Sequence, residues 1–372
     1  MKNVGKSPKQ NRVYADWAAT SPICQPAKQA MVEAMEAYGN PSSLHRDGTQ
    51  AKRIVEEARE KVAALINADP GEIYFTSGAT EANVWALSGE SFPLVSEIEH
   101  HSVFNRPGRI SKMLPVNANG VVYTPKDFSR HGGYINSSIC SVMAVNNETG
   151  VIQDVRAICE WAHDHNMVFH TDATQAVGHI PVDVKAIGCD MLSMSAHKFC
   201  GPKGVGALYI KRGTPKSPLF HGGGQENGMR PGTENVIGIA GMGAAAQVCM
   251  ECMPEAWEKT QSLQRRIEAK VLSALDGVKI AGVESDRLST ITDFLFDGVE
   301  GPALVVALDQ RNVSASSGSA CSEGSYGPSH VLKAMGLEKY GSLRISIGWS
   351  TTIEDADYIA KAVIDSVKEL RR

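Results

Sequence analysis

The sequence lacks any long uninterrupted apolar run, and no stretch approaches the roughly 18 residues that a membrane-spanning helix needs. It also lacks a strong charge of one sign, because 37 Lys and Arg side chains face 41 Asp and Glu, for a net charge of -4. This balance disfavours binding to nucleic acid or to an anionic membrane surface. Residues 1–12 are polar and basic, without the apolar core of a secretory signal. We therefore expect a cytoplasmic protein with neither a nucleic-acid partner nor a membrane partner.

Cysteine is present without any regular spacing, at positions 24, 140, 159, 189, 200, 249, 252 and 321. In a reducing compartment, most such cysteines are small buried side chains with free thiols. Cys249 and Cys252 have the spacing of half a zinc site or of a redox pair. No second Cys or His pair follows them at a suitable distance, so we predict no metal site.

The length of 372 residues suggests two domains, or one large domain with a small additional subdomain. Apolar spacing predicts strands that alternate with helices, and polar residues collect just after the strands. The predicted strands are 12–15, 72–75, 94–97, 139–145, 167–171, 190–194 and 206–210. The predicted helices are 25–38, 49–66, 155–165 and one that starts at 81. This order indicates an α/β sheet with a ligand at its edge.

The last third of the chain has an α+β pattern. We predict a long helix from 233 to about 252, a second helix at 258–275, and then the strands 288–296 and 342–347 and the helices 302–310 and 353–370. The boundary near Pro254 gives a large domain of residues 16–254. Residues 1–15 and 255–372 would form the smaller domain.

Lys198 is the first candidate for chemistry. It follows the predicted strand 190–194 and lies beside His197, before the glycine-rich turn at 201–204. A partly desolvated lysine can lose its proton and form a Schiff base with a carbonyl compound. The alternative is an ordinary solvated loop lysine.

Small and hydroxyl-bearing residues at 76–80 join a predicted strand to the helix that starts at Glu81. Such a junction leaves backbone N–H groups open to an anion, and the helix dipole favours negative charge there. Ordinary helix capping by Ser or Thr is the alternative. The segment is not a Walker phosphate loop, and no strand is followed by Gly-x-Gly-x-x-Gly.

Asp172 ends a strongly apolar strand, where an acidic group must be paired or must lie at a cleft. One known use of such a group is to pair with the ring nitrogen of a pyridinium cofactor. The alternative is a helix N-cap, with Gln175 three residues on in a partial capping box. His100 follows the predicted strand 94–97 and can lie over a flat cofactor ring.

Cys321 differs from the other cysteines because it lies in the glycine- and serine-rich loop 314–328. A thiol in such a loop is expected to be exposed and therefore reactive. A thiol hydrolase without a cofactor is one interpretation, but no histidine is clearly placed as its base.

Together these segments resemble the pyridoxal-phosphate-dependent cysteine desulfurases of the NifS/IscS type. The shared motifs lie at 39–43, 76–81, 99–100, 145–148, 172–175, 195–198, 221–226, 230–235 and 316–321, in the family's order. The resemblance implies the α/β fold of aspartate aminotransferase (fold type I). In that fold, a large domain has a mainly parallel sheet flanked by helices, and a smaller domain is α+β.

The resemblance also implies an activity: L-cysteine is converted to L-alanine, and its sulfur moves to Cys321 as a persulfide for an acceptor. Pyridoxal 5'-phosphate would be the cofactor, and Lys198 would bind it covalently and move the substrate's α-proton. Asp172 would pair with the pyridine nitrogen, and His100 would stack on the ring. Thr233 would reach the cofactor phosphate of a partner subunit, which implies a homodimer with shared sites.

The other implied roles concern binding. Gln175 would reach the phenolic oxygen of the cofactor, and Arg344 would clamp the substrate carboxylate with help from Asn147. The implied catalytic residues are Cys321, Lys198 and His100. The implied cofactor-binding residues are Lys198, Ala79, Thr80, His100, Asn147, Asp172, Gln175, Ser195, His197 and Thr233. The implied substrate-binding residues are Arg344, Asn147 and Asn40.

The chain departs from the family pattern at Val84, where an asparagine is usual, and has Asn83 one residue earlier. This leaves one contact to the cofactor ring open. The stretches 87–94 and 104–115 are shortened, which bears on docking of the acceptor. A selenocysteine lyase, another aminotransferase-like enzyme and a non-catalytic sulfur-relay partner are the alternatives. The acceptor could serve iron–sulfur cluster assembly, tRNA thiolation or cofactor sulfuration.

Overall fold

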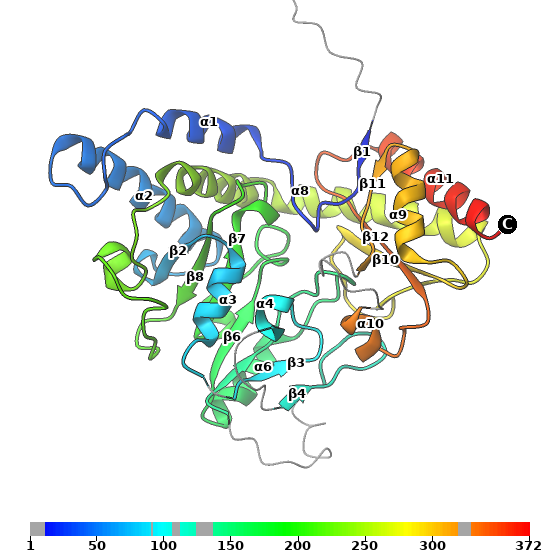
Figure 1. The fold of residues 1–372 in the computed structure, drawn as a ribbon, viewed down its shortest axis with the longest axis horizontal. Coiled ribbons are helices and arrows are strands. Elements are labelled where there is room, and N and C mark those ends of the chain that lie inside the picture. Colours follow the sequence, from blue (N-terminus) through cyan, green and yellow to red (C-terminus); the bar gives the residue numbers. More distant parts are fainter. Residues whose placement is uncertain (1–11, 91, 106–111, 124–136, 319–328) are drawn as a thin grey trace, which may run out of the picture.

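The computed structural model describes residues 12–90, 92–105, 112–123, 137–318 and 329–372. Its larger sheet has seven strands in the order β2-β8-β7-β6-β5-β3-β4 (Figure 1). In that order the strands are Ile73–Thr76, Gly206–Ile210, Met191–Ser195, Val168–Asp172, Ile139–Ser141, Leu94–Ser96 and Lys112–Leu114. Among these described strands, β8 is antiparallel to both β2 and β7, and all the other neighbouring pairs are parallel. The predicted mainly parallel sheet is confirmed.

Both faces of this sheet are covered by apolar side chains, which explains why its strands read as continuous apolar runs. Met191 of β7 packs on the same side as Trp85 of helix α3 (Ala79–Leu87). The next residue, Leu192, faces the opposite cluster, together with Val55 of α2 (Arg46–Leu65) and Ile158 of α6 (Val155–Asp164). Successive strand residues point to opposite faces, so one strand supplies both clusters. Two further short helices described on this part of the chain are α4 (His101–Phe104) and α7 (Val184–Ile187).

A second, three-stranded sheet has the order β12-β10-β9 and is antiparallel. Its strands are Gly341–Ser346, Ile291–Phe296 and Val278–Ile280. Helices α9 (Gly301–Gln310) and α11 (Ile353–Leu370) pack beside it, whereas the buried residues of α10 (His330–Ala334) belong to the cluster of the larger sheet. A separate core cluster fills this region, and β1 (Val13–Tyr14) joins it by pairing with β11 (Val313–Ser314). We propose the domain division 16–254 and 1–15 with 255–372, because every member of this separate cluster lies in the second part. The larger cluster is not confined to the first part, since it also takes in Leu288, Ile291 and Leu295.

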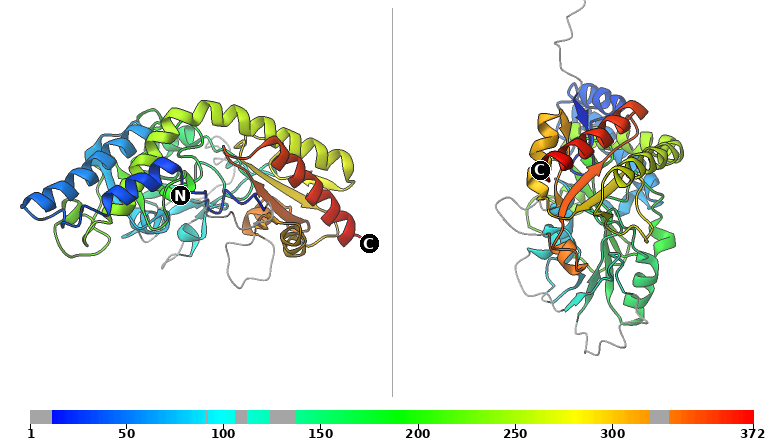
Figure 2. Two further views of the ribbon diagram at one scale, coloured as in Figure 1. Left: turned by 90° about the horizontal axis from the view of Figure 1, so that it is seen from above. Right: turned by 90° about the vertical axis from the view of Figure 1, so that its right-hand side faces the viewer.

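Helix α8 (Val236–Ala274) is one continuous helix of 39 residues, so the predicted break between 252 and 258 is wrong. Pro254 lies inside α8 on its exposed surface, where water can satisfy the carbonyl that loses its N–H partner. The first half of α8 packs against α1 (Gln25–Ala34) and α2, and its second half contributes to the cluster around α11. Figure 2 shows α8 running along the length of the molecule. Packing on both sides of Pro254 keeps the helix continuous.

Within the described ranges, α8 is also the one helix long and apolar enough to cross a membrane by length and composition. Its contacts with α1, α2 and α11 are those of a core helix.

Candidate active site

A cavity of about 510 Å³ opens between the two sheets, beside the carboxyl ends of the parallel strands. Asp172 is the last residue of β6 and Ser195 is the last residue of β7, while His100 and Asn147 follow β3 and β5. Arg344 enters from β12 of the smaller sheet. The predicted site residues that line this cavity are Ala79, Thr80, His100, Asn147, Asp172, Gln175, Ser195, His197, Lys198 and Arg344.

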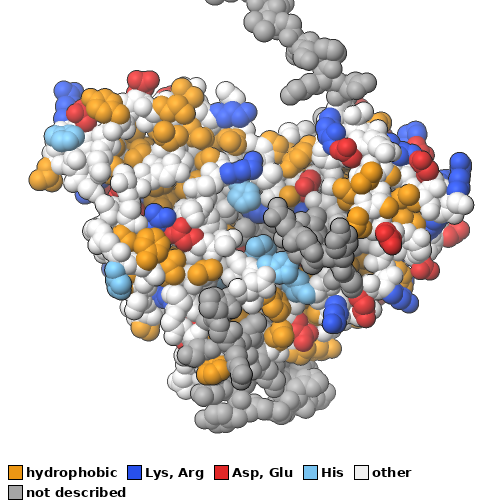
Figure 3. Space-filling model, viewed as in Figure 1, with side chains coloured by type: hydrophobic (Ala, Val, Ile, Leu, Met, Phe, Trp, Pro, Cys, Tyr) orange, Lys and Arg blue, Asp and Glu red, His pale blue; other side chains and the backbone are white. Residues whose placement is uncertain are grey.

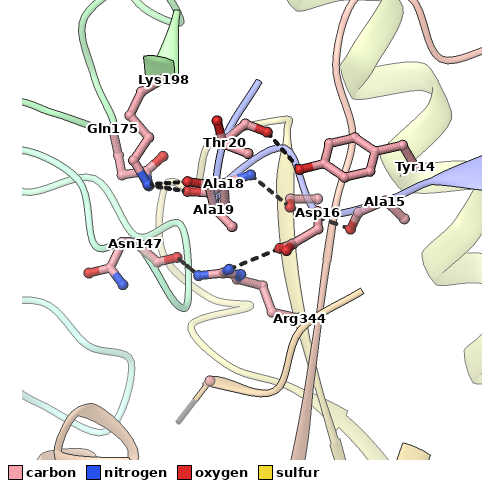
Figure 4. Close-up of polar contacts among 12 residues, drawn as sticks. Tyr14, Ala15, Asp16, Ala18, Ala19, Thr20, Asn147, Gln175, Lys198 and Arg344 are labelled. Carbon is pink, nitrogen blue, oxygen red and sulfur yellow. Dashed lines mark hydrogen bonds and ion pairs between the residues drawn. The ribbon is translucent and has the colours of Figure 1, made fainter. Parts of the chain in front are cut away.

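Lys198 ends the short 3-10 turn Ala196–Lys198, directly after β7. Its Nζ donates to the carbonyl oxygen of Ala18 at 2.6 Å and to that of Ala19 at 3.0 Å (Figure 4). Gln175 Nε2 donates to the same Ala18 oxygen at 2.9 Å. The lysine amine is therefore held at a defined point of the cavity wall, which differs from a solvated loop lysine.

Asp172 is buried, with 4% of its surface exposed, and both of its carboxylate oxygens accept hydrogen bonds. Oδ2 accepts from Asn83 Nδ2 at 2.6 Å, and Oδ1 accepts from the backbone N–H of Thr174 at 3.0 Å. Turns follow Asp172, and no helix begins there, so the helix N-cap interpretation is wrong. The carboxylate is fixed in place and faces the cavity.

Asn83 was noted from the sequence only as the asparagine one position before Val84, and no site role was predicted for it. It is fully buried in α3, and its Nδ2 also donates to Ser102 Oγ at 2.9 Å. Ser102 Oγ lies 2.8 Å from His100 Nδ1. One hydrogen-bonded chain thus runs from Asp172 through Asn83 to His100. The neighbouring Val84 is 36% exposed, whereas the buried Asn83 contacts Asp172.

His100 accepts the backbone N–H of Ser102 at its Nδ1, at 3.1 Å. Burial lowers the pKa of His100, the charges of Lys198 and His101 act in the same direction, and Asp172 opposes them. The neutral ring then carries its proton on Nε2. The ring centroids of His100 and His101 are 6.3 Å apart, and those of His101 and His330 are 5.0 Å apart. Figure 3 shows histidine side chains gathered near the middle of this face.

The start of α3 is the place where the sequence predicts an anion site. Its N-cap residue, Gly78, makes no side-chain capping bond, so the first-turn N–H groups remain available to a ligand. Thr80, Ser195 and His197 line the same part of the cavity. Burial, together with the positive charge of Lys198, lowers the pKa of His197 to about 4, so this ring is neutral at physiological pH.

These residues fit pyridoxal phosphate. The cavity combines an amine at Lys198, a carboxylate at Asp172 and an uncapped helix N-terminus, which match the aldehyde, ring nitrogen and phosphate of that cofactor. Thr174 also lines the cavity, and its buried Oγ1 has no hydrogen-bond partner among the described residues. In the described part of the chain, no group of three His, Cys, Asp or Glu side chains could hold a metal ion.

Arg344 has a side chain that is only 2% exposed. Its Nη1 donates to the backbone carbonyl of Asn147 at 2.8 Å, and its Nη2 lies 3.1 Å from Asp16 Oδ1. The predicted help from Asn147 therefore includes its backbone oxygen, which holds the guanidinium. A held guanidinium at a cavity wall can bind a carboxylate in a defined orientation.

Two of the predicted site residues that the structure describes, Asn40 and Thr233, do not line this cavity. Asn40 is exposed on the loop after α1, and its Oδ1 accepts the backbone N–H of Ser42 at 2.9 Å. The structure thus gives no support to Asn40 as a substrate contact within its own chain. Thr233 is exposed before the start of α8, outside the cavity of its own chain. Cys321 lies outside the described residues.

The other cysteines are free thiols away from the cavity. Six of them are buried, as predicted, and Cys252 is half-buried. Burial raises the pKa of Cys159 and of Cys200 to about 12, which keeps both thiols protonated and unreactive.

Comparison with known proteins gives consistent matches. The family model described as aminotransferase class-V matches residues 13–359. A protein named cysteine desulfurase IscS from Dictyoglomus turgidum is 41% identical over 380 residues, covering 97% of this chain and 96% of the relative. The protein of the same name from Methanosarcina thermophila is 39% identical, over 98% of this chain and 94% of the relative.

Solved structures agree with these sequence matches. A NifS-like protein from Rickettsia africae has a TM-score of 0.88 and 30% identity, with 97% of this chain and 99% of that chain covered. A structure described as SspA in complex with cysteine has a TM-score of 0.77 and 31% identity, with 90% of this chain and 98% of that chain covered.

Proposed function

Because this chain belongs to the aminotransferase class-V family, we propose that it is a cysteine desulfurase dependent on pyridoxal 5'-phosphate. It converts L-cysteine to L-alanine and transfers the sulfur to Cys321. The observation that carries the proposal is the convergence of Lys198, Asp172 and Arg344 on one cavity. These residues supply the amine, carboxylate and guanidinium that the cofactor and an amino-acid substrate require.

The lining residues would hold each part of the cofactor. Lys198 would bind the aldehyde carbon, Asp172 would pair with the ring nitrogen, Gln175 would reach the phenolic oxygen and His100 would cover one ring face. Thr80, Ser195, His197 and the N–H groups at the start of α3, including that of Ala79, would hold the phosphate. Bound in this way, pyridoxal phosphate supplies an electron-accepting ring that stabilises negative charge on the substrate's α-carbon.

The chain's own residues then bind the substrate and move its proton. Arg344 binds the carboxylate of L-cysteine and so fixes the orientation of the α-carbon. The Nζ of Lys198 takes the proton from that carbon as a general base and later returns a proton. The carbonyl oxygens of Ala18 and Ala19 hold this amine beside the reacting carbon.

Sulfur transfer uses the thiolate of Cys321. Its sulfur attacks the substrate sulfur, so that an S–S bond forms and the substrate C–S bond breaks. The substrate carbon keeps the electron pair of the broken bond and takes up a proton to become the methyl group of L-alanine. The enzyme is left with a persulfide, and no further oxidant or reductant is consumed in this step.

The partners follow from the same proposal. The chain acts as a homodimer in which Thr233 reaches the partner's cofactor phosphate. It works in the cytoplasm and delivers persulfide sulfur to an acceptor protein, such as a scaffold for iron–sulfur cluster assembly. The exposure of Thr233 ahead of α8 supports its availability to a second subunit.

The proposal is tested by incubating the holoenzyme with L-cysteine and a thiol reductant. We expect L-alanine and sulfide in equal amounts. Cys321→Ala should lose turnover and keep the yellow colour of the bound cofactor, whereas Lys198→Ala should lose covalent retention of the cofactor. Cys252→Ala, at a half-buried cysteine of α8, is the matched control and should keep full activity. A protein that cannot be loaded with pyridoxal phosphate would contradict the proposal.

A further inference from the structure

The segment between β1 and α1 crosses from the smaller sheet to the cavity, and its backbone is tied to the end of β12. Ser346 N–H donates to the Ala15 carbonyl oxygen at 2.8 Å, and Trp17 N–H donates to the Ser346 carbonyl oxygen at 3.3 Å. Ala18 N–H donates to Ser346 Oγ at 2.9 Å. These bonds hold the segment without any contribution from the side chain of Asp16.

The Asp16 side chain makes a separate contact, to Arg344. Its Oδ1 lies 3.1 Å from Arg344 Nη2, and the two side chains are 19% and 2% exposed (Figure 4). At the other terminal nitrogen, Nη1 donates to the Asn147 carbonyl oxygen at 2.8 Å. Two partners from different parts of the chain therefore fix the plane of the guanidinium.

Asp16 contacts Arg344 and is not itself part of the cavity lining. Arg344, in contrast, is one of the cavity-lining residues. A carboxylate in that position orients the guanidinium without occupying the space of a ligand. Arg344 Nε is buried and has no hydrogen-bond partner among the described residues, so the guanidinium keeps unused donor capacity.

Two other carboxyl groups lie near Arg344, and neither replaces Asp16. Asp293 is directly opposite Arg344 in the β10–β12 register, and Glu148 lies next to Asn147. Burial raises the pKa of Asp293 to about 7 and that of Glu148 to about 8, against the lowering effect of Arg344. Among the described residues, only Asp16 forms an ion pair with Arg344.

We propose that Asp16 is a positioning residue that orients Arg344 for the α-carboxylate of the substrate. This inference rests on the proposed function, because it assumes an amino-acid substrate in the cavity. Asp16 does not touch the substrate. Its effect reaches the substrate only through the guanidinium, so it depends on whether the ligand carries a carboxylate.

The test compares two ligands of the holoenzyme, L-alanine and L-alaninamide, which differ in the presence of the carboxylate. Binding is followed by the change in visible absorbance of the bound cofactor. In Asp16→Asn we expect the Kd of L-alanine and the KM of L-cysteine to rise about 5- to 20-fold. The reason is that a misoriented Arg344 guanidinium loses its bidentate contact with the ligand carboxylate. The Kd of L-alaninamide and the kcat should stay within about twofold, because the segment's backbone bonds remain.

Controls separate positioning from a general structural role. Asp357→Asn breaks an exposed ion pair between α11 and α8, away from the cavity, and should leave both ligands unchanged. In an Arg344→Lys background, adding Asp16→Asn should have little further effect on L-alanine binding. Asp16→Glu keeps the charge, so it should recover part of the lost affinity and serves as the readout if Asp16→Asn fails to fold.

Three results would overturn the inference: tighter binding of L-alanine in Asp16→Asn, equal weakening of both ligands, or an undiminished effect in the Arg344→Lys background. A wild-type holoenzyme that neither binds L-alanine nor consumes L-cysteine would instead contradict the proposed function.

Discussion

At the scale of single residues, the cavity depends on polar side chains that other buried groups hold in place. Asn83 donates to Asp172 and to Ser102, and Ser102 in turn contacts His100. The carboxylate and the imidazole that would flank the cofactor ring are thereby linked through one amide. Removing that amide leaves a buried carboxylate oxygen without its 2.6 Å partner.

We predict that Asn83→Ala lowers kcat/KM for L-cysteine by about tenfold and weakens retention of pyridoxal phosphate, since a buried hydrogen bond to a charged group is lost. Steady-state kinetics and cofactor release during dialysis measure the two effects. Val84→Asn, at the adjacent exposed position, is the control and should stay within about twofold of wild type. Equal effects of the two substitutions would show that the link through Asn83 has no role.

Much of the cavity was predictable residue by residue, because Lys198, Asp172, Ser195 and His100 each lie at the end of a strand of the same sheet or just after it. Parallel strands end at a shared edge, so local sequence was sufficient to group them. The contact from Asn83 was not predictable, because it depends on how α3 lies over β6. Asn40 was placed by resemblance alone, and its amide instead accepts a bond within its own loop.

At the scale of elements, α8 contributes to the core clusters of both sheets. Its packing also overrides the tendency of a proline to end a helix. Pro254 predicts a helix end, yet the helix continues because its halves are held by α1 and α2 on one side and by α11 on the other. Close approach of α8 to α2 depends on Gly243. A Cβ atom at Gly243 would lie 2.7 Å from the Cα and Cβ atoms of Ala58.

We predict that Gly243→Val destabilises the protein by about 1–3 kcal/mol, because overpacking forces the two helices apart. Thermal unfolding of the holoenzyme should show a lower Tm. Gln247→Ala, at an exposed position of the same helix, is the control and should leave the Tm unchanged. An unchanged Tm in Gly243→Val would mean that α2 and α8 can separate without cost.

At the scale of the whole molecule, ionisable groups are buried where the two sheets meet. Glu148, from the loop after β5, interacts electrostatically with Asp293 of β10 and with Arg344 of β12. Burial raises the pKa of Glu148 from its ordinary value of 4.5 to about 8. The junction between the sheets is therefore sensitive to proton loss.

We predict that the free energy of unfolding falls as the pH rises from about 6.5 to 8. The folded state binds the Glu148 proton up to about pH 8, whereas the unfolded state releases it near pH 4.5, so each pH unit between them costs up to about 1.4 kcal/mol for this group. Below pH 6.5, histidines that are buried in the neutral form become protonated on unfolding, so their effect on stability opposes this trend. Above pH 6.5 that effect is absent. Glu148→Gln should flatten the fall in Tm, and Glu338→Gln, at an exposed position, should not. If the Tm of Glu148→Gln depended on pH in the same way as that of the wild type, Glu148 would not be the group responsible for the fall.

We propose that this cavity removes sulfur from L-cysteine and passes it to one particular thiol. Mass spectrometry of peptides from the holoenzyme after reaction with L-cysteine without reductant, together with assay of L-alanine, tests this step. We expect one extra sulfur atom on the peptide that contains Cys321, with an equal amount of L-alanine. Extra sulfur on another cysteine, or L-cysteine left unconsumed, would contradict the proposal.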